Sequence, residues 1–227
     1  MAGGDDPPGF ASPPCYAHEL DPAYRELLAE APAMPAEVRR WRRAERERLR
    51  AERRALGAAE RRRIAGLVAD HLERLLACWL GSVTGRRIAV WWPIDGELNL
   101  RPLFAAWHAH GAVLALPVVV EPKRPLHFHR WTPTSRMQPG YWNVPVPAAG
   151  EPVAPEVVLA PLVGFDAACH RLGHGGGYYD RTLATVLPKP IAVGVGPSLG
   201  QLATIRPQPH DVPMGAIVTE AGVLRPG

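Results

Sequence analysis

The chain has 227 residues, of which 47% are hydrophobic, and carries a formal net charge of +4. This length allows one domain with a core of its own, and no apolar run approaches the roughly 20 residues of a membrane-spanning helix. The first residues, MAGGDDPPGFASPP, contain acidic side chains and no apolar centre, unlike a signal peptide. We therefore expect a cytoplasmic protein without membrane contact, whose cysteines Cys15, Cys78 and Cys169 are free thiols.

The N-terminal part of the chain divides into an arm and two helices. Residues 1–33 are rich in proline and glycine and lack a periodic apolar pattern, which predicts an arm, either mobile or wrapped over the surface of the domain formed by residues 34–227. Residues 36–56 favour a helix by propensity but have few apolar side chains. Residues 58–80 predict an amphipathic helix, because their apolar residues recur at steps of three and four.

The rest of the chain alternates short apolar segments with helical ones. Several of the apolar segments end at proline or glycine, as buried strands often do. This alternation favours an α/β fold, namely a single three-layer domain with a largely parallel central sheet flanked by helices, in a Rossmann-like arrangement. We expect strands at residues 87–93, 112–120, 126–131, 156–165, 191–196 and 215–220, and helices at 100–111 and 178–187.

Arginine is concentrated between Arg39 and Arg63, where twelve of the chain's 26 basic residues lie. One interpretation is a solvated helix face on which arginines pair with neighbouring glutamates. The other is an anion-binding site, for nucleic acid or for the phosphates of a nucleotide. Nucleic acid is the less expected partner, because Trp41 is the only aromatic residue among these arginines. The glutamates in or beside this stretch are Glu37, Glu45, Glu47, Glu52 and Glu60.

The sequence RLGHGGGYYDRTL, residues 171–183, lies between a predicted strand and a predicted helix. Glycine lets backbone N–H groups approach an anion without a Cβ in the way, and the helix N-terminus adds a partial positive charge. Arg171 can donate a forked pair of hydrogen bonds to phosphate. Asp180, in the first helical turn, can bind a metal ion that bridges phosphate oxygens. This order of strand, glycine loop and helix predicts an anion-binding turn.

Five further motifs accompany this loop in a fixed order. They are RAERERLRAERRALGAAER (43–61), DGELN (95–99), GAVLALPVV (111–119), YWNVPVP (141–147) and HDVPM (210–214). With these motifs and PLVGFDAACHRLGHGGGYYDRTL (161–183), the chain resembles the 5-formyltetrahydrofolate cyclo-ligase family, also called methenyltetrahydrofolate synthetases, from about residue 40 to residue 220. Each motif alone is a weak signal, whereas the ordered set is specific.

The resemblance implies an ATP- and magnesium-dependent ligase that converts 5-formyltetrahydrofolate to 5,10-methenyltetrahydrofolate and releases ADP and phosphate. It implies phosphorylation of the formyl oxygen and ring closure by N10, with Tyr179 and Arg171 as catalytic residues and Tyr179 orienting the formyl group. By similarity, ATP would contact Arg42, Arg46, Arg171, Leu172, Gly173, His174, Gly175, Gly176, Gly177, Tyr178 and Tyr179. The folate would contact Trp92, Glu97, Trp142 and Tyr179, and Mg²⁺ would bind Asp180 and Asp211, which we expect to be exposed.

The chain departs from the family's pattern at several positions. Arg42 stands where members carry a lysine that reaches ATP, and arginine is a wider, planar donor. Cys169 occupies a position usually held by glycine, and Leu100 replaces a polar residue. Since none of these changes removes a carboxylate, they bear on affinity and rate more than on reaction class. A catalytically altered or non-catalytic relative of the same fold remains an alternative, and a nucleic-acid-binding protein is the less favoured one.

Overall fold

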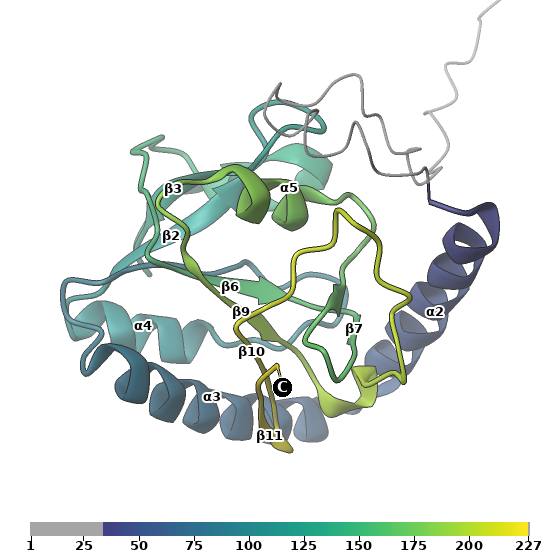
Figure 1. The fold of residues 1–227 in the computed structure, drawn as a ribbon. Helices are drawn as coiled ribbons and strands as arrows, with labels where there is room; N and C mark the ends of the chain where they lie inside the picture. Colours follow the sequence, from purple (N-terminus) through teal and green to yellow (C-terminus); the bar gives the residue numbers. More distant parts are fainter. Residues whose placement is uncertain (1–33, 227) are drawn as a thin grey trace, which may run out of the picture.

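The computed structural model describes residues 34–226, so the predicted arm, residues 1–33, lies outside the described residues. Within this part, seven strands form one sheet in the order β11-β10-β9-β6-β1-β2-β3 (Figure 1). The five central strands are parallel, while β3 and β11 pair antiparallel at the two edges. The strands are β1 (Arg87–Ala89), β2 (Val113–Val118), β3 (His127–Trp131), β6 (Val157–Pro161), β9 (Ile191–Val195), β10 (Ala216–Thr219) and β11 (Gly222–Leu224).

Helices cover both faces of this sheet. The helices α3 (Ala58–Leu80) and α4 (Arg101–Ala109) lie on one face, and α5 (Tyr178–Thr185) lies on the other (Figure 1). The core divides accordingly, because alternate residues of a strand point to opposite faces. Ile88 packs with the apolar residues of α3 and α4, and its neighbour Ala89 packs in a second cluster with Leu183 of α5. The predicted α/β fold with a largely parallel sheet and flanking helices is therefore confirmed.

Smaller elements lie outside the large sheet and were not predicted. The strands β4 (Met137–Pro139) and β5 (Pro145–Pro147) form a hairpin around the short 3₁₀ helix η2 (Tyr141–Asn143). The strands β7 (Gly164–Phe165) and β8 (Arg171–Leu172) form a second antiparallel pair, and the 3₁₀ helix η3 (Ser198–Gly200) follows β9. Both strand pairs are short, and prolines in β4 and β5 mask the alternation that identifies strands in a sequence.

Two predicted strands have different bounds in the structure. The strand expected at residues 87–93 ends at Ala89, and residues 90–100 form a loop that leads into α4. The strand expected at residues 156–165 is interrupted, because the chain changes hydrogen-bond partners: Leu162 N–H donates to Val195 in β9, but Val163 N–H donates to Leu172 in β8. Each correction places irregular backbone at the carboxyl edge of the sheet, where loops can carry functional side chains.

The helix α2 (Ala36–Ala55) flanks this carboxyl edge (Figure 1). Its most buried residues are Val38, Arg42, Leu49 and Arg53, so two of its four buried side chains are charged. No helix in residues 34–226 is both long enough and apolar enough to span a membrane. Both cysteines in this part of the chain, Cys78 and Cys169, are free thiols as expected.

Candidate active site

The glycine-rich segment forms a tight loop between β8 and α5. Gly175 and Gly177 have φ angles of 105° and 63°, which side chains other than glycine rarely adopt, and Gly177 caps α5. A Cβ atom on Gly173 would lie 2.5 Å from the Arg171 side chain, and one on Gly176 would lie 2.9 Å from the Tyr178 ring. Side chains at these positions would clash with their neighbours or strain the backbone, so the loop consists of glycine. Its N–H groups are therefore open to an anion, as an anion-binding turn requires.

Arg171 lies buried at the base of this loop. Its Nη2 atom donates to Asp180 Oδ2 at 2.9 Å, and its guanidinium lies 5.0 Å from the centre of the Tyr179 ring. Its Nε–H is buried and has no acceptor among residues 34–226. Since an unsatisfied buried donor is costly, this atom marks Arg171 as a group that a bound anion would stabilise.

Arg46 joins α2 to the glycine loop, because its Nε donates to Gly173 O at 2.8 Å. Burial, aided by the charge of Arg42, lowers the pKa of Arg46 to about 10. Asp211 and Asp180 oppose this decrease, whereas Arg171 adds to it, so all five charged groups lie near one another. Three arginines face two aspartates, and the side chains near the loop therefore carry one net positive charge at neutral pH.

Arg42 lies one helical turn from Arg46 and is 3% exposed. It donates from Nε to Ile205 O (3.0 Å), from Nη2 to Arg206 O (2.9 Å), and from Nη1 to Asp211 Oδ1 (3.2 Å); Nη2 also bonds Asp211 Oδ2. Four of its five N–H groups thus have acceptors within the protein. A contact between Arg42 and ATP stays a prediction from the resemblance, and the geometry favours Arg46 as the helix residue that faces the loop.

The two aspartates expected to bind Mg²⁺ are not exposed, since the side chains of Asp180 and Asp211 are 13% and 7% exposed. The prediction from sequence that both are exposed was wrong. Each carboxylate is buried against an arginine with which it forms an ion pair, Asp180 with Arg171 and Asp211 with Arg42. Val212 N–H donates to Asp180 Oδ1 at 3.4 Å, which brings the two aspartates close together. Both carboxylates have donors on both of their oxygens, and Asp180 is the more exposed of the two.

No cluster of three or more His, Cys, Asp or Glu side chains suited to a metal ion occurs in the part of the chain that the structure describes. Mg²⁺ commonly binds one or two carboxylates together with substrate phosphates and water. Asp180 fits such a partial ligand set, in which an ion would arrive with a nucleotide. The assignment of Mg²⁺ to Asp180 and Asp211 stays a prediction.

Glu97 reaches the glycine loop from residues 90–100. Its side chain is 4% exposed, its Oε1 pairs with His174 Nε2 at 2.8 Å, and its Oε2 accepts from Ile94 N–H at 3.1 Å. Burial raises the pKa of Tyr179 strongly, with Arg171 opposing and Glu97 adding to the increase. The Tyr179 hydroxyl is therefore protonated at neutral pH and can donate a hydrogen bond near Glu97. The structure thus brings Glu97, His174 and Tyr179 close together, and their roles toward ATP and a folate stay predictions.

Trp142 lies over the other side of the loop and is 57% exposed. A Cβ atom on Gly176 would lie 3.2 Å from its ring, and the ring centres of Tyr141 and Tyr178 lie 4.7 Å and 5.6 Å from that of Trp142. The φ angle of Trp142 is 54°, a left-handed conformation that costs free energy for such a residue and often occurs at functional sites. Sequence reasoning missed Tyr141, although it directly precedes Trp142.

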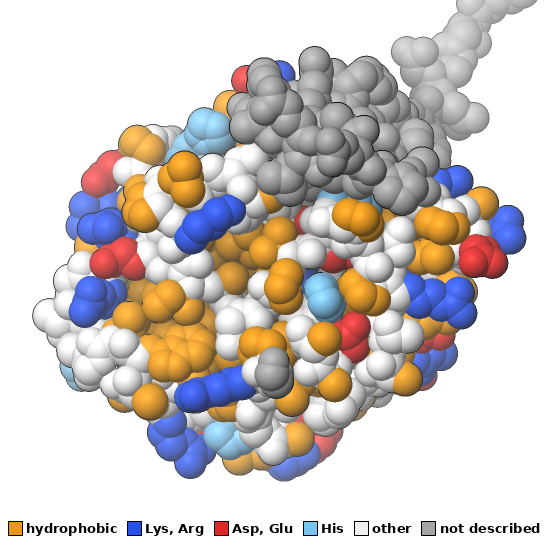
Figure 2. Space-filling model, viewed as in Figure 1, with side chains coloured by type: hydrophobic (Ala, Val, Ile, Leu, Met, Phe, Trp, Pro, Cys, Tyr) orange, Lys and Arg blue, Asp and Glu red, His pale blue; other side chains and the backbone are white. Residues whose placement is uncertain are grey.

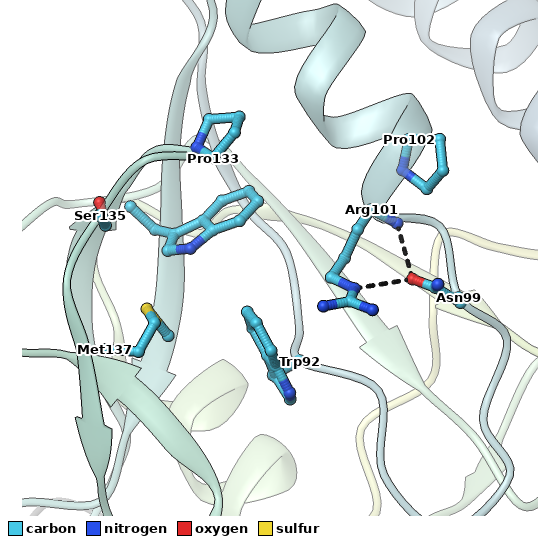
Figure 3. A pocket seen from close by; sticks show the side chains of 8 residues that line it. Trp92, Asn99, Arg101, Pro102, Pro133, Ser135 and Met137 are labelled. Carbon is cyan, nitrogen blue, oxygen red and sulfur yellow. Dashed lines mark hydrogen bonds between the residues drawn. The ribbon is translucent and has the colours of Figure 1, made fainter.

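Two other predicted residues, Trp92 and Leu172, make contacts other than those predicted. Trp92 packs against Arg101, whose guanidinium lies 4.7 Å from the ring centre, and lines a pocket next to α4 (Figure 3). Leu172 is fully buried in the core, and its backbone carbonyl accepts from Val163 N–H. Contacts of Trp92 with a folate and of Leu172 with ATP stay predictions.

Asp95 is a structural residue that sequence reasoning missed. Its carboxylate accepts from Arg50 Nε (2.5 Å) and Arg54 Nη1 (2.8 Å), and its carbonyl accepts from Arg53 Nη2 (3.0 Å). The contacts fix the loop that carries Glu97, two residues further along. The signal was present in the sequence, because Arg42, Arg46 and Arg50 recur every four residues and so share one face of a helix.

Three of the remaining arginines of this stretch, Arg43, Arg48 and Arg63, pair with glutamates, as the first interpretation predicted. The pairs are Arg43–Glu47, Arg48–Glu45, Arg48–Glu52 and, on α3, Arg63–Glu60. On the face shown in Figure 2, the basic side chains are scattered and do not form one continuous patch. Most arginines of this stretch thus have contacts within the protein, which weakens the nucleic-acid alternative.

Together, these features define an α/β protein with a doubly flanked, largely parallel sheet, whose glycine loop and buried arginines have the chemistry suited to binding an anion. Comparison with known proteins gives the family. The model of the 5-formyltetrahydrofolate cyclo-ligase family matches residues 38–220, and the chain belongs to this family.

Curated relatives and solved structures agree with this assignment. The chain is 33% identical over 104 residues to the 5-formyltetrahydrofolate cyclo-ligase of Haemophilus influenzae and 35% identical over 107 residues to that of Escherichia coli K12. These matches cover 43% and 44% of this chain and 56% and 59% of the relatives, so the chain spans somewhat more than half the length of each.

The NMR structure of Aquifex aeolicus 5,10-methenyltetrahydrofolate synthetase is similar with a TM-score of 0.68 and 31% identity, covering 81% of this chain and 92% of that one. A Mycoplasma pneumoniae 5,10-methenyltetrahydrofolate synthetase shares the fold, with a TM-score of 0.63 and 22% identity over 79% of this chain and 98% of that one.

Proposed function

We propose that this protein is a 5-formyltetrahydrofolate cyclo-ligase, which uses ATP and Mg²⁺ to form 5,10-methenyltetrahydrofolate, ADP and phosphate. The observation that carries the proposal is the glycine loop, Gly173–Gly177, with the buried Arg171 beneath it and Arg46 beside it. Bare backbone N–H groups, a helix N-terminus and two arginines are the groups that bind and neutralise phosphates. Family membership supplies the substrate that the geometry alone does not identify.

In the proposed reaction, the formyl oxygen attacks the γ-phosphorus of ATP and ADP leaves. N10 of the folate then attacks the formyl carbon, the phosphate departs with the former formyl oxygen, and N10 loses its proton. Phosphoryl transfer depends mainly on positioning and on stabilising the charge that develops on the phosphoryl oxygens. Arg171 and Arg46 would hold these oxygens, and Asp180 would bind the magnesium ion that accompanies ATP.

The remaining residues would act on the folate. Glu97, held by Ile94 and His174, presents a buried carboxylate that can accept N–H bonds from the edge of a pterin. Tyr179, which remains protonated, would donate a hydrogen bond and orient the formyl group. Trp142 offers a flat, exposed ring against which a flat ligand can pack.

The test is direct: the purified protein is mixed with ATP, Mg²⁺ and 5-formyltetrahydrofolate, and the absorbance of the methenyl product is followed. We expect the absorbance to increase only when all three components are present. Arg171→Ala, examined in parallel, should lose at least about a hundred-fold in kcat/KM, as expected for removing a charged donor from a transition state. Absence of product with a folded protein that still binds ATP would favour a catalytically altered relative instead.

A further inference from the structure

A pocket of about 350 Å³ lies beside the loop of residues 90–100. Several of its residues, among them Arg101, Trp131 and Met137, have no role in the proposed reaction. Figure 3 shows Arg101 and Asn99 on one side, Met137 and Ser135 on the opposite side, and Trp92 between them. Two segments far apart in the sequence form this pocket: residues 92–102, which lead into α4, and residues 131–137, which join β3 to β4.

Arg101 is held in one orientation within this pocket. Asn99 Oδ1 accepts from its Nε at 2.9 Å and from its backbone N–H at 3.3 Å, and the Trp92 ring lies beneath the guanidinium. Its terminal nitrogens, Nη1 and Nη2, have no carboxylate partner within residues 34–226. By contrast, Arg42, Arg50 and Arg171 each pair with a carboxylate. Arg101 is exposed but oriented by Asn99, and is therefore a preorganised donor for a ligand carboxylate.

The rest of the pocket is apolar and partly aromatic. Trp92 and Trp131 contribute indole rings, and Met137 contributes a polarisable side chain. A site that combines an oriented arginine with aromatic walls fits a ligand that joins an aromatic ring to a carboxylate. The loop that carries Trp92 also carries Glu97 five residues further along, so one short segment connects the pocket with the proposed pterin site.

We propose that this pocket binds the aminobenzoyl-glutamate tail of the folate, with Arg101 pairing with a tail carboxylate and Trp92 and Trp131 lining the benzoyl ring. The proposal rests on the proposed function, since it takes the substrate as a folate. It assigns Arg101 as a specificity-determining residue that recognises the glutamate rather than the reacting formyl group.

The first test uses the fragment p-aminobenzoyl-glutamate and needs no turnover. Its dissociation constant for the full-length protein is measured by ligand-observed NMR titration, alongside p-aminobenzamide, which lacks the glutamate. We expect Arg101→Ala to weaken binding of the fragment by about ten- to a hundred-fold, the loss typical of a charge-assisted hydrogen bond, and to leave p-aminobenzamide unaffected. Arg101→Lys should retain part of the affinity.

The matched control is Arg136→Ala, which removes an exposed arginine next to the pocket residues Ser135 and Met137. It should leave fragment binding within about two-fold of wild type, because Arg136 does not line the pocket, whereas Arg101, although also exposed, lines it and is oriented by Asn99. Equal weakening by Arg136→Ala would show general attraction of an anion and would overturn the assignment to Arg101. Failure of the folded wild-type protein to bind the fragment would overturn it as well.

A second test separates this inference from the proposed function. The ratio of kcat/KM for 5-formyltetrahydrofolate to that for the same substrate without its glutamate should fall about ten-fold or more in Arg101→Ala. If the ratio is the same in Arg101→Ala as in the active wild-type enzyme, the role of Arg101 is overturned and the proposed function stays intact. A protein that binds the fragment through Arg101 but forms no methenyl product would leave the pocket assigned and refute the proposed function.

Discussion

Arg42 and Arg43 are neighbours on α2, yet they lie in opposite environments. Arg42 is buried and donates to Asp211 and to two backbone carbonyls, whereas the side chain of Arg43 is 66% exposed and pairs with the equally exposed Glu47. The helix therefore has an inward face whose arginines hold other parts of the chain and an outward face whose arginines meet only solvent and glutamate. The two arginines are equivalent in amino-acid composition, but the contribution of each to the free energy of unfolding depends on the face that it occupies.

The inward face connects three loops at the carboxyl edge of the sheet. Arg42 binds the segment from Ile205 to Asp211, Arg46 binds the glycine loop at Gly173, and Arg50 binds Asp95 in the loop that carries Glu97. Because these three arginines follow one another at steps of four, one rigid helix sets the relative positions of all three loops. We infer that α2 holds the site together more than it binds ligand.

The largest expected effect comes from breaking the inward ion pair. Arg42→Ala should reduce the free energy of unfolding by about 3–5 kcal/mol, because it leaves the carboxylate of Asp211 buried without its partner. The measurement is urea unfolding followed by circular dichroism, with the m-value checked for constancy. The double variant Arg42→Ala, Asp211→Ala should recover part of the loss, since it removes both charges. A loss below about 1 kcal/mol in the single variant would contradict the role of the Arg42–Asp211 pair in holding the segment from Ile205 to Asp211 on α2.

The next effect concerns Arg46, whose guanidinium faces the glycine loop. Arg46→Ala should raise the KM for ATP about ten- to a hundred-fold while changing the KM for the folate little, since it removes one charge-assisted contact of about 1.5–3 kcal/mol. Arg46→Lys, which keeps the charge, should retain part of the affinity. Steady-state kinetics with each substrate varied in turn would measure both constants. Equal increases in the two constants would mean that Arg46 only shapes the loop.

The two faces also show what the sequence could predict. The strands and helices of the large sheet followed from local patterns of apolar residues, because burial on a sheet face leaves a period of two or an apolar run. The glycine loop and Asp180 followed from the chemistry of phosphate binding. The pairing of Arg42 with Asp211 did not, because these residues lie 169 positions apart and only the folded chain brings them together. The resemblance predicted a contact between Arg42 and ATP. In the structure, Arg42 is buried against the segment from Ile205 to Asp211, which no local sequence pattern indicates.

A smaller effect is expected from pH. Burial alone would raise the pKa of Asp211, but hydrogen bonds and the charge of Arg42 outweigh burial and lower it below its ordinary value of 3.8. A carboxyl group whose pKa is lowered by folding stabilises the protein above the unfolded value and loses this contribution as the pH falls. The stability of the wild type should therefore decrease between about pH 5 and about pH 3 more steeply than that of Asp211→Asn.

Parallel profiles for wild type and Asp211→Asn, measured by urea unfolding at each pH, would show that this ion pair does not couple stability to protonation. Glu47→Gln on the outward face is the matched control. Its profile should run parallel to that of the wild type, because its partner Arg43 is as exposed as Glu47 itself.

The smallest effect is expected on the outward face, where Arg43→Ala removes the ion pair between Arg43 and Glu47, which lie one helical turn apart. Exposed pairs at this spacing contribute about 0.3–0.5 kcal/mol and weaken as salt screens them. We expect Arg43→Ala to change the free energy of unfolding by at most about 0.5 kcal/mol and to leave both KM values unchanged, since alanine favours the helix as well as arginine does. Unfolding in low and high salt would separate the ionic part from helix propensity. A loss comparable to that of Arg42→Ala would mean that the two faces do not differ, and α2 would then act through its net charge.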